Sequence, residues 1–113
     1  MTGTSSGIGL STAVLLAKAG FTTVATLRNP SRAKALEERA RSEGVTLDVQ
    51  PLDVCNQASV DACVAQVQAR YGAIDVLVNN AGAGIVGTVE QLSVEAVQAN
   101  FDVNFFGVWR MTR

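Results

Sequence analysis

The sequence has no histidine and only two cysteines, Cys55 and Cys63, which stand eight positions apart. These absences exclude the usual Cys/His zinc spacings, so we expect no metal site, and they exclude a histidine general base. We expect both cysteines to be reduced, half-buried thiols of a cytoplasmic protein, because disulfides are rare in the cytosol. No run approaches the roughly 18 apolar residues of a membrane span, and no signal-like segment opens the chain. We therefore expect neither secretion nor a membrane partner.

The chain also lacks an excess of either charge, with nine Lys+Arg against ten Asp+Glu and a net charge of -1. A field this weak gives no reason to bind nucleic acid or an anionic membrane. The 113 residues amount to one domain, residues 1–113, whose 48% hydrophobic and 17% charged content is typical of an α/β protein with buried strands. If the protein binds an anion, individual charged or N–H groups at the site must attract it, because the net charge of the whole protein does not.

Strands and helices alternate along the sequence. Helices are predicted at 7–19, 30–43, 59–71 and 93–111, and the first three are each followed by a glycine. Strands are predicted at 22–27, 45–53 and 74–82, the last being a mostly apolar run typical of a strand covered on both faces. This alternation predicts right-handed βαβ units, and hence an α/β fold with a doubly wound parallel sheet.

The segment TGTSSGIGL, residues 2–10, leads into the first predicted helix and is rich in glycine and in hydroxyl side chains. Its small residues are Gly3, Ser5, Ser6, Gly7 and Gly9. Glycine permits positive φ and a close approach of a ligand to the main chain. The free N–H groups and positive dipole end of a helix beginning near Gly7 would form an anion site that suits a pyrophosphate. We expect Ile8 to pack the helix start on the sheet. The alternative is a tight connection without a ligand.

Five short motifs together resemble the short-chain dehydrogenase/reductase family. They are Thr-Gly-x-x-x-Gly-Ile-Gly at 2–9, Asp53-Val54, Asp75-Val76-Leu77-Val78, Asn79-Asn80-Ala81-Gly82 and Val103-Asn104-Phe105-Phe106-Gly107. The resemblance covers nearly the whole chain. It implies a Rossmann-type sheet, truncated here, with the first strand and the C-terminal strands missing. It also implies hydride transfer between a nicotinamide cofactor and a small-molecule carbonyl or alcohol substrate. A looser similarity to the steroid- and retinol-type reductase branch fixes no substrate.

The resemblance also implies which residues contact the cofactor. In the glycine-rich segment these are Gly3, Ser5, Ser6, Gly7, Ile8 and Gly9, around the diphosphate and the adenosine ribose. Asp53 and Val54 would flank the adenine, and Asn80, Ala81 and Gly82 would lie along the ribose. Their positions agree with this, since each lies at or just past the carboxyl end of a predicted parallel strand, where open α/β sheets bind ligands. Asp53 and Asn80 could also be ordinary turn formers.

The choice between the two nicotinamide cofactors depends on the end of the strand at 22–27. An NAD site generally has an acidic side chain there, whereas an arginine accommodates the 2′-phosphate of NADP. The sequence has Arg28 at this point and no carboxylate before Glu37. Arg28 could contact the phosphate through its planar fork, with Ser6 as a neighbouring donor. We therefore predict NADP(H) rather than NAD(H), with Arg32 as a weaker candidate and a merely solvated Arg28 as the alternative.

The last predicted helix carries an amide, Asn104, in an otherwise apolar stripe. Asn104 is either a hydrogen-bonded core residue or part of a functional polar network. The resemblance favours the second, with Asn104 supporting catalysis by holding a water that links to a catalytic lysine. That lysine should follow a tyrosine by four places, but the only tyrosine is Tyr71 and position 75 is Asp75. We expect this chain to be an inactive fragment by itself. The alternatives are a non-catalytic dinucleotide-binding module, a partner subunit, or a product with no ligand.

The same helix leads us to expect self-association. Its stripe of Val97, Phe101, Val108 and Met111 has no predicted cover within the chain, and the strands next to a missing first strand would have exposed edges. By the resemblance this helix helps to form a subunit interface. We therefore expect a homo-oligomer of the full-length protein.

Overall fold

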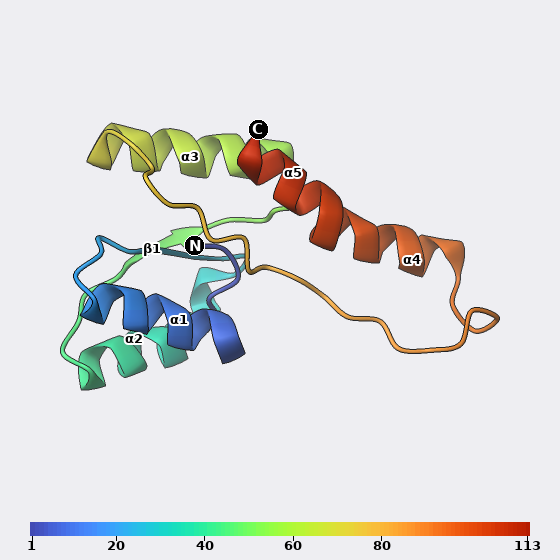
Figure 1. The fold of residues 1–113 in the computed structure, drawn as a ribbon, viewed down its shortest axis with the longest axis horizontal. Helices are drawn as coiled ribbons and strands as arrows, with labels where there is room; N and C mark the ends of the chain where they lie inside the picture. The colour runs from blue at the N-terminus through green and yellow to red at the C-terminus, as the bar shows by residue number, and fades with distance from the viewer.

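The computed structural model describes residues 1–113 and has short strands beside longer helices (Figure 1). The helices are α1 (Gly7–Lys18), α2 (Lys34–Ser42), α3 (Gln57–Tyr71), α4 (Val94–Phe101) and α5 (Gly107–Thr112). The strands are β1 (Val24–Leu27) and β2 (Asp48–Pro51). A 3-10 turn, η1 (Pro30–Arg32), which is tighter than an α-helix, precedes α2. A π-helical turn, η2 (Asp102–Phe106), which is wider than an α-helix, precedes α5. The predicted order of helices is confirmed, as are the first two predicted strands.

β1 and β2 form a parallel pair whose register runs from Val24 opposite Asp48 to Leu27 opposite Pro51. The connection between them contains α2, as a βαβ unit requires. In Figure 1, α1 and α2 lie on one face of this pair, whereas α3 and α5 lie on the other. Helices on both faces confirm the doubly wound arrangement.

The segment 74–82 is extended but is not a regular strand, so this part of the strand prediction is wrong. It lies beside the amino-terminal residues, where the Thr2 N–H donates to the Val78 carbonyl at 3.0 Å. On the other side, the Thr26 N–H of β1 donates to the Met1 carbonyl at 3.0 Å. The spatial order is therefore β2, β1, the amino-terminal residues, and 74–82. A single backbone hydrogen bond joins 74–82 to the amino-terminal residues, so the two segments form no regular ladder.

Two apolar clusters support this sheet from opposite sides. The cluster under α1 and α2 contains Ala13, Val14, Ala25, Leu27, Ala33, Leu36 and Ala40. The cluster under α3 contains Leu52, Val54, Val60, Cys63 and Val67. Both cysteines are free thiols as expected; Cys55 is half-buried, but Cys63 is buried. The strand ends are therefore held by packing on both faces.

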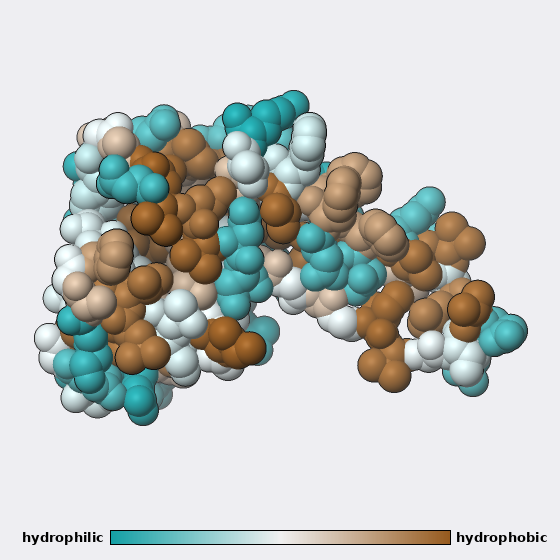
Figure 2. Space-filling view, viewed as in Figure 1, coloured by the Kyte–Doolittle hydropathy of each residue, from teal (hydrophilic) through white to brown (hydrophobic).

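The predicted helix at 93–111 is interrupted at its centre. Ser93 caps α4 by accepting a hydrogen bond from the Ala96 N–H at 3.2 Å. In η2 the Gly107 N–H donates to the Asp102 carbonyl, five residues back, which is the π-helical pattern. Apolar side chains remain exposed along this part of the chain, among them Phe101 and Val108 of the predicted stripe, and Figure 2 shows apolar side chains gathered over α4 and the loop before it. Met111, the last residue of that stripe, packs instead against the cluster under α3. None of the helices has the length and apolarity needed to cross a membrane.

Candidate functional site

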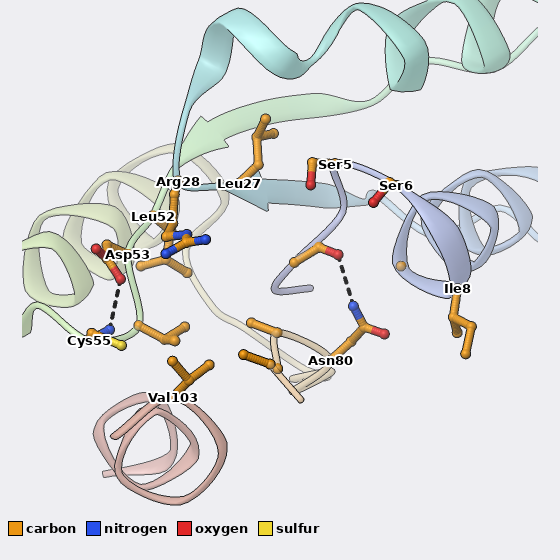
Figure 3. Close-up of a pocket in the computed structure, with 16 residues that line it drawn as sticks. Ser5, Ser6, Ile8, Leu27, Arg28, Leu52, Asp53, Cys55, Asn80 and Val103 are labelled. Carbon is orange, nitrogen blue, oxygen red and sulfur yellow. Dashed lines mark hydrogen bonds between the residues drawn. The ribbon is translucent and has the colours of Figure 1, made fainter. Parts of the chain in front are cut away.

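A cleft of about 330 Å³ opens at the carboxyl ends of β1 and β2 (Figure 3). Its wall combines the glycine-rich segment 2–10, the turn after β2, and the turn after 74–80. The lining residues are Gly3, Ser5, Ser6, Ile8, Gly9, Leu27, Arg28, Leu52, Asp53, Val54, Cys55, Asn80, Ala81, Gly82, Ala83 and Val103. Of the cofactor residues predicted from the sequence, the cleft thus brings together all except Gly7.

Two glycines make the close approach of the cleft walls possible. A Cβ on Gly3 would lie 2.7 Å from the Ala81 Cα, and Gly3 has a φ of 71°. A Cβ on Gly9 would run into the Gly3 carbonyl oxygen and lie 2.5 Å from the Asn80 Nδ2. Gly7 is different, because its φ of 57° requires glycine while the space around it is open. The segment is therefore shaped by contacts to the 80–82 turn as well as by its own turn.

Asn80 joins these two segments. Its side-chain amide donates to the Thr2 carbonyl at 3.0 Å. It also donates to the Gly3 carbonyl at 2.9 Å, the bond drawn in Figure 3. In return the Thr2 hydroxyl, which is buried, accepts from the Asn80 and Ala81 N–H groups at 3.0 and 2.9 Å. The Asn80 side chain thus joins two distant segments instead of forming a local turn, and it also lines the cleft. The sequence prediction missed Thr2, although it begins the motif at 2–9.

The amino end of α1 faces the cleft without a cap. Its first residue is preceded by Ser6, which has extended backbone angles (φ -165°, ψ 175°) and makes no side-chain capping hydrogen bond. The first turn also contains no acidic residue. The unpaired N–H groups and positive dipole end of α1 are therefore free to meet an anion.

Ile8 does not pack the helix start on the sheet, so that prediction is wrong. Its side chain is 80% exposed and points away from the cleft floor (Figure 3). The buried residues of α1 are Gly9, Ala13 and Val14. At the start of α1 the close contact is made by Gly9, which lies against Gly3 and Asn80, and not by Ile8.

Arg28 follows β1 directly and reaches into the cleft beside Leu52 and Asp53 (Figure 3). It is exposed and takes part in none of the ion pairs of the structure. Arg32, the weaker candidate, lies in η1 and does not line the cleft. Arg28 is therefore the guanidinium available to a ligand at this edge.

The turn after β2 forms the wall opposite the glycine-rich segment. The Asp53 carboxylate accepts a hydrogen bond from the Cys55 N–H at 3.0 Å, so Asp53 also forms an ordinary turn. The buried Val54 packs against α5, where a Cβ on Gly107 would lie 2.8 Å from its Cγ2. Burial raises the pKa of the Cys55 thiol, and the nearby Asp102 carboxylate raises it further. With its pKa raised, the Cys55 thiol stays protonated near neutral pH, so this wall offers no thiolate.

Asn104 is exposed, so it is not the core residue considered as one alternative. Its Nδ2 donates to the Ala83 carbonyl at 2.7 Å and to the Asn100 carbonyl at 2.9 Å, while its Oδ1 accepts from the Ala83 N–H at 3.2 Å. Asn100, which sequence reasoning missed, also donates to the Ala83 carbonyl, at 2.7 Å. Asn104 lies behind the cleft lining, in a polar network that holds Ala83. The sequence signal that could have indicated Asn100 is its spacing, four residues before Asn104, which places both amides on one side of a helix.

Tyr71, the single tyrosine, is not in the cleft. It ends α3, and its hydroxyl donates to the Asp48 carboxylate at 2.9 Å, at the start of β2. Burial raises the pKa of Tyr71, and the hydrogen bond to Asp48 adds to the rise. Tyr71 therefore stabilises the opposite end of the sheet.

Comparisons with known proteins identify one group of relatives. Residues 1–113 match the family described as short chain dehydrogenase. Retinol dehydrogenase 8 of Homo sapiens is 47% identical over 117 residues, which cover 100% of this chain and 37% of the relative. 17-beta-hydroxysteroid dehydrogenase type 1 of Mus musculus is 43% identical over 117 residues, which cover 98% of this chain and 33% of the relative. The chain thus spans about a third of the length of these two relatives.

Solved structures give the same result for the fold. A variant of actinorhodin polyketide ketoreductase with NADPH has a TM-score of 0.91 and 37% identity, over 98% of this chain and 42% of that protein. Gluconate 5-dehydrogenase from Burkholderia cenocepacia, in complex with NADP and tartrate, has a TM-score of 0.86 and 39% identity, over 98% of this chain and 44% of that protein. The chain therefore has the Rossmann-type α/β fold.

Proposed function

Since the chain belongs to the short-chain dehydrogenase family, we propose that it is the cofactor-binding part of an NADP(H)-dependent oxidoreductase. The protein would transfer hydride between the nicotinamide and a small carbonyl or alcohol substrate. The nicotinamide supplies the hydride chemistry when bound, and the protein binds and orients it. The single observation that carries the proposal is the glycine-lined cleft onto which the uncapped end of α1 opens.

The residues of the cleft fit a dinucleotide. Gly3 and Gly9 let the glycine-rich segment lie against Ala81 and Asn80 without side chains of its own, so main-chain groups rather than side chains form this part of the cleft wall. The free N–H groups of α1 suit the negative charge of a diphosphate, with Ser5 and Ser6 as hydroxyl donors and Gly7 and Ile8 at the helix start. These residues are proposed to hold the diphosphate and the adenosine ribose.

The other two walls would hold the rest of the cofactor. We assign the adenine to Asp53 and Val54, and the ribose side to Asn80, Ala81 and Gly82, which line the cleft after the neighbouring sheet segments. Asn104 would act through its contacts to Ala83, and its proposed catalytic support comes from the family resemblance.

Arg28 supports a preference for NADP(H). A guanidinium that is free of protein carboxylates can make charge-assisted hydrogen bonds to a 2′-phosphate. The similar solved structures named above contain NADPH or NADP. The two free thiols support a reducing, cytoplasmic location.

The competing function is a dinucleotide-binding module or partner subunit without catalysis. The 113 residues contain no Tyr-x-x-x-Lys pair, so we propose that they are inactive by themselves. Assaying the full natural protein with NADPH and a series of aldehydes and ketones separates the two: turnover supports the oxidoreductase, whereas binding without turnover supports the module.

The cofactor assignment is tested by calorimetry on the full natural protein. We expect NADPH to bind at least tenfold more tightly than NADH, because a hydrogen bond to a charged group stabilises by about 1.5–3 kcal/mol. The variant Arg28→Gln should lose this preference through weaker NADPH binding alone. The control Arg32→Gln, outside the cleft, should keep it. Absence of heat with both nucleotides would reject the proposed function, whereas binding of NADH alone would reject only the assignment of Arg28.

A further inference from the structure

Arg110 in α5 links the helix to the wall of the cleft that follows β2. Its Nη2 lies 2.6 Å from the Asp102 Oδ1, and its Nη1 donates to the Val54 carbonyl at 3.1 Å. The Arg110 side chain is 23% exposed and that of Asp102 36%, so the ion pair is partly shielded from water. The proposed function has no role for Arg110, although its guanidinium fixes the main chain of a residue that lines the cleft.

The π-helical turn η2 explains how this contact forms. Asp102 and Arg110 are eight residues apart, and on a regular α-helix they would face directions about 80° apart. A π-helical turn adds one residue without adding a turn, so the pair is spaced like residues seven apart, within roughly 20° of one direction. The turn between them therefore places carboxylate and guanidinium on one face, toward Val54.

The same helical segment also holds the opposite wall. Asn100, before the turn, and Asn104, within it, bind the main chain of Ala83, at the end of the 80–83 wall. After the turn, in α5, Arg110 binds the main chain of Val54. Figure 3 shows Val103, from the middle of this segment, pointing into the cleft between Cys55 and Asn80. The helix thus connects the two walls, and its interrupted form determines how far apart they lie.

We propose that Arg110 is a positioning residue for nucleotide binding, which fixes the Val54 wall at the distance that the adenine half of the cofactor requires. The proposal rests on the proposed function of the cleft. Asp102 orients the guanidinium, and its own pKa is lowered chiefly by the hydrogen bond from Arg110, so the carboxylate stays charged near neutral pH. Val54 then keeps its carbonyl turned toward α5 and its side chain against Gly107.

The test uses the full natural protein and two probes, NADPH and adenosine 2′,5′-bisphosphate, which carries only the adenosine half. We expect Arg110→Gln to weaken the binding of both probes about tenfold, because a charge-assisted pair and a main-chain contact are lost. Arg110→Lys should recover part of the affinity, because an ammonium can pair with Asp102 but lacks the planar fork that reaches both partners. Asp102→Asn should weaken the binding of adenosine 2′,5′-bisphosphate by about threefold. The effect is smaller because the bond from Arg110 to the Val54 carbonyl can remain.

Arg70→Gln is the matched control. It removes another Arg–Asp pair, with Asp48 at 3.0 Å, at the end of β2 away from the cleft. We expect a smaller fall in melting temperature, because the Arg70 side chain is 61% exposed, and unchanged affinity for both probes.

The proposal is overturned if Arg110→Gln and Asp102→Asn bind adenosine 2′,5′-bisphosphate within twofold of the wild type. It is also overturned if Arg70→Gln weakens binding as much as Arg110→Gln, since the effect would then be general loss of stability. A wild-type protein that binds neither probe overturns the proposed function as well. A wild type that binds both, with variants that bind equally, overturns the role of Arg110 alone.

Discussion

At the scale of single residues, the cleft depends on positions where a side chain has no room. Gly9 is the clearest, because a Cβ there would collide with the Gly3 carbonyl and approach the Asn80 amide that joins the two walls. Other glycines, such as Gly84, have open space around them. Glycine is therefore required at Gly9 because the glycine-rich segment and the turn containing Asn80 approach each other closely there.

We predict that Gly9→Ala destabilises the protein by about 1–3 kcal/mol, the usual cost of forcing atoms into a packed site. NADPH binding should fall at least tenfold, because the Asn80 link would have to shift. Denaturant unfolding and calorimetry measure the two effects. Gly84→Ala is the control and should leave both unchanged, since nothing lies within 4 Å of its Cβ and its φ is not positive. Equal stability and affinity in the two variants would contradict the prediction.

At the scale of elements, the helix starts differ in how their N–H groups are satisfied. Asn29, Asn56 and Ser93 each accept a hydrogen bond from the first turn of the helix that they precede. Ser6, before α1, does not, and it precedes the helix that opens onto the cleft. α2 and α5 also lack a side-chain cap, but they follow directly on the turns η1 and η2, whereas α1 follows the extended Ser6 and leaves its donors to a ligand.

We predict that Asn56→Ala lowers the free energy of unfolding by about 1 kcal/mol, because its side chain accepts from the Ser59 N–H at 3.1 Å. Ser6→Ala should change it by less than about 0.5 kcal/mol, because the Ser6 side chain makes no capping bond. Denaturant unfolding of the two variants without nucleotide measures the difference. An equal loss in both would show that α1 is capped in solution.

At the scale of the whole molecule, the α4–η2–α5 segment leaves large apolar side chains uncovered. Phe101 and Phe105 are each 56% exposed and Trp109 is 62% exposed. Exposed apolar patches of this kind are typical of interaction surfaces. Of the predicted stripe, Phe101 and Val108 are exposed, whereas Val97 is half-buried and Met111 packs against the cluster under α3, so the prediction is confirmed only in part. Self-association into a homo-oligomer stays a prediction.

We predict that Phe101→Glu weakens self-association of the full natural protein about tenfold or more, because a charge would be buried in the contact. Sedimentation velocity over a range of concentrations measures this. Leu15→Glu is the control: Leu15 is 63% exposed on α1, away from the segment, and its replacement should leave association unchanged. If Phe101→Glu leaves the sedimentation profile unchanged, the prediction that self-association uses the α4–η2–α5 segment is wrong.

The sequence by itself determined the elements and the cleft to which they lead. Glycine stops, asparagine caps and β-branched runs are local signals, so the helices and the strands β1 and β2 were predicted within a few residues. The carboxyl ends of parallel strands meet at one edge of a sheet, so the residues after them, including Arg28 and Asp53, were expected together and lie together.

Only the tertiary structure decided features that depend on a distant partner. The segment 74–82 remains irregular because its hydrogen-bond partner is a few residues at the other end of the chain. Ile8 is exposed because Gly9 makes the close contact of α1. The π-helical turn, and with it the reach of Arg110 to Val54, has no signature in the local sequence. Such contacts join residues dozens of positions apart, and their energies appear only once the chain has brought them together.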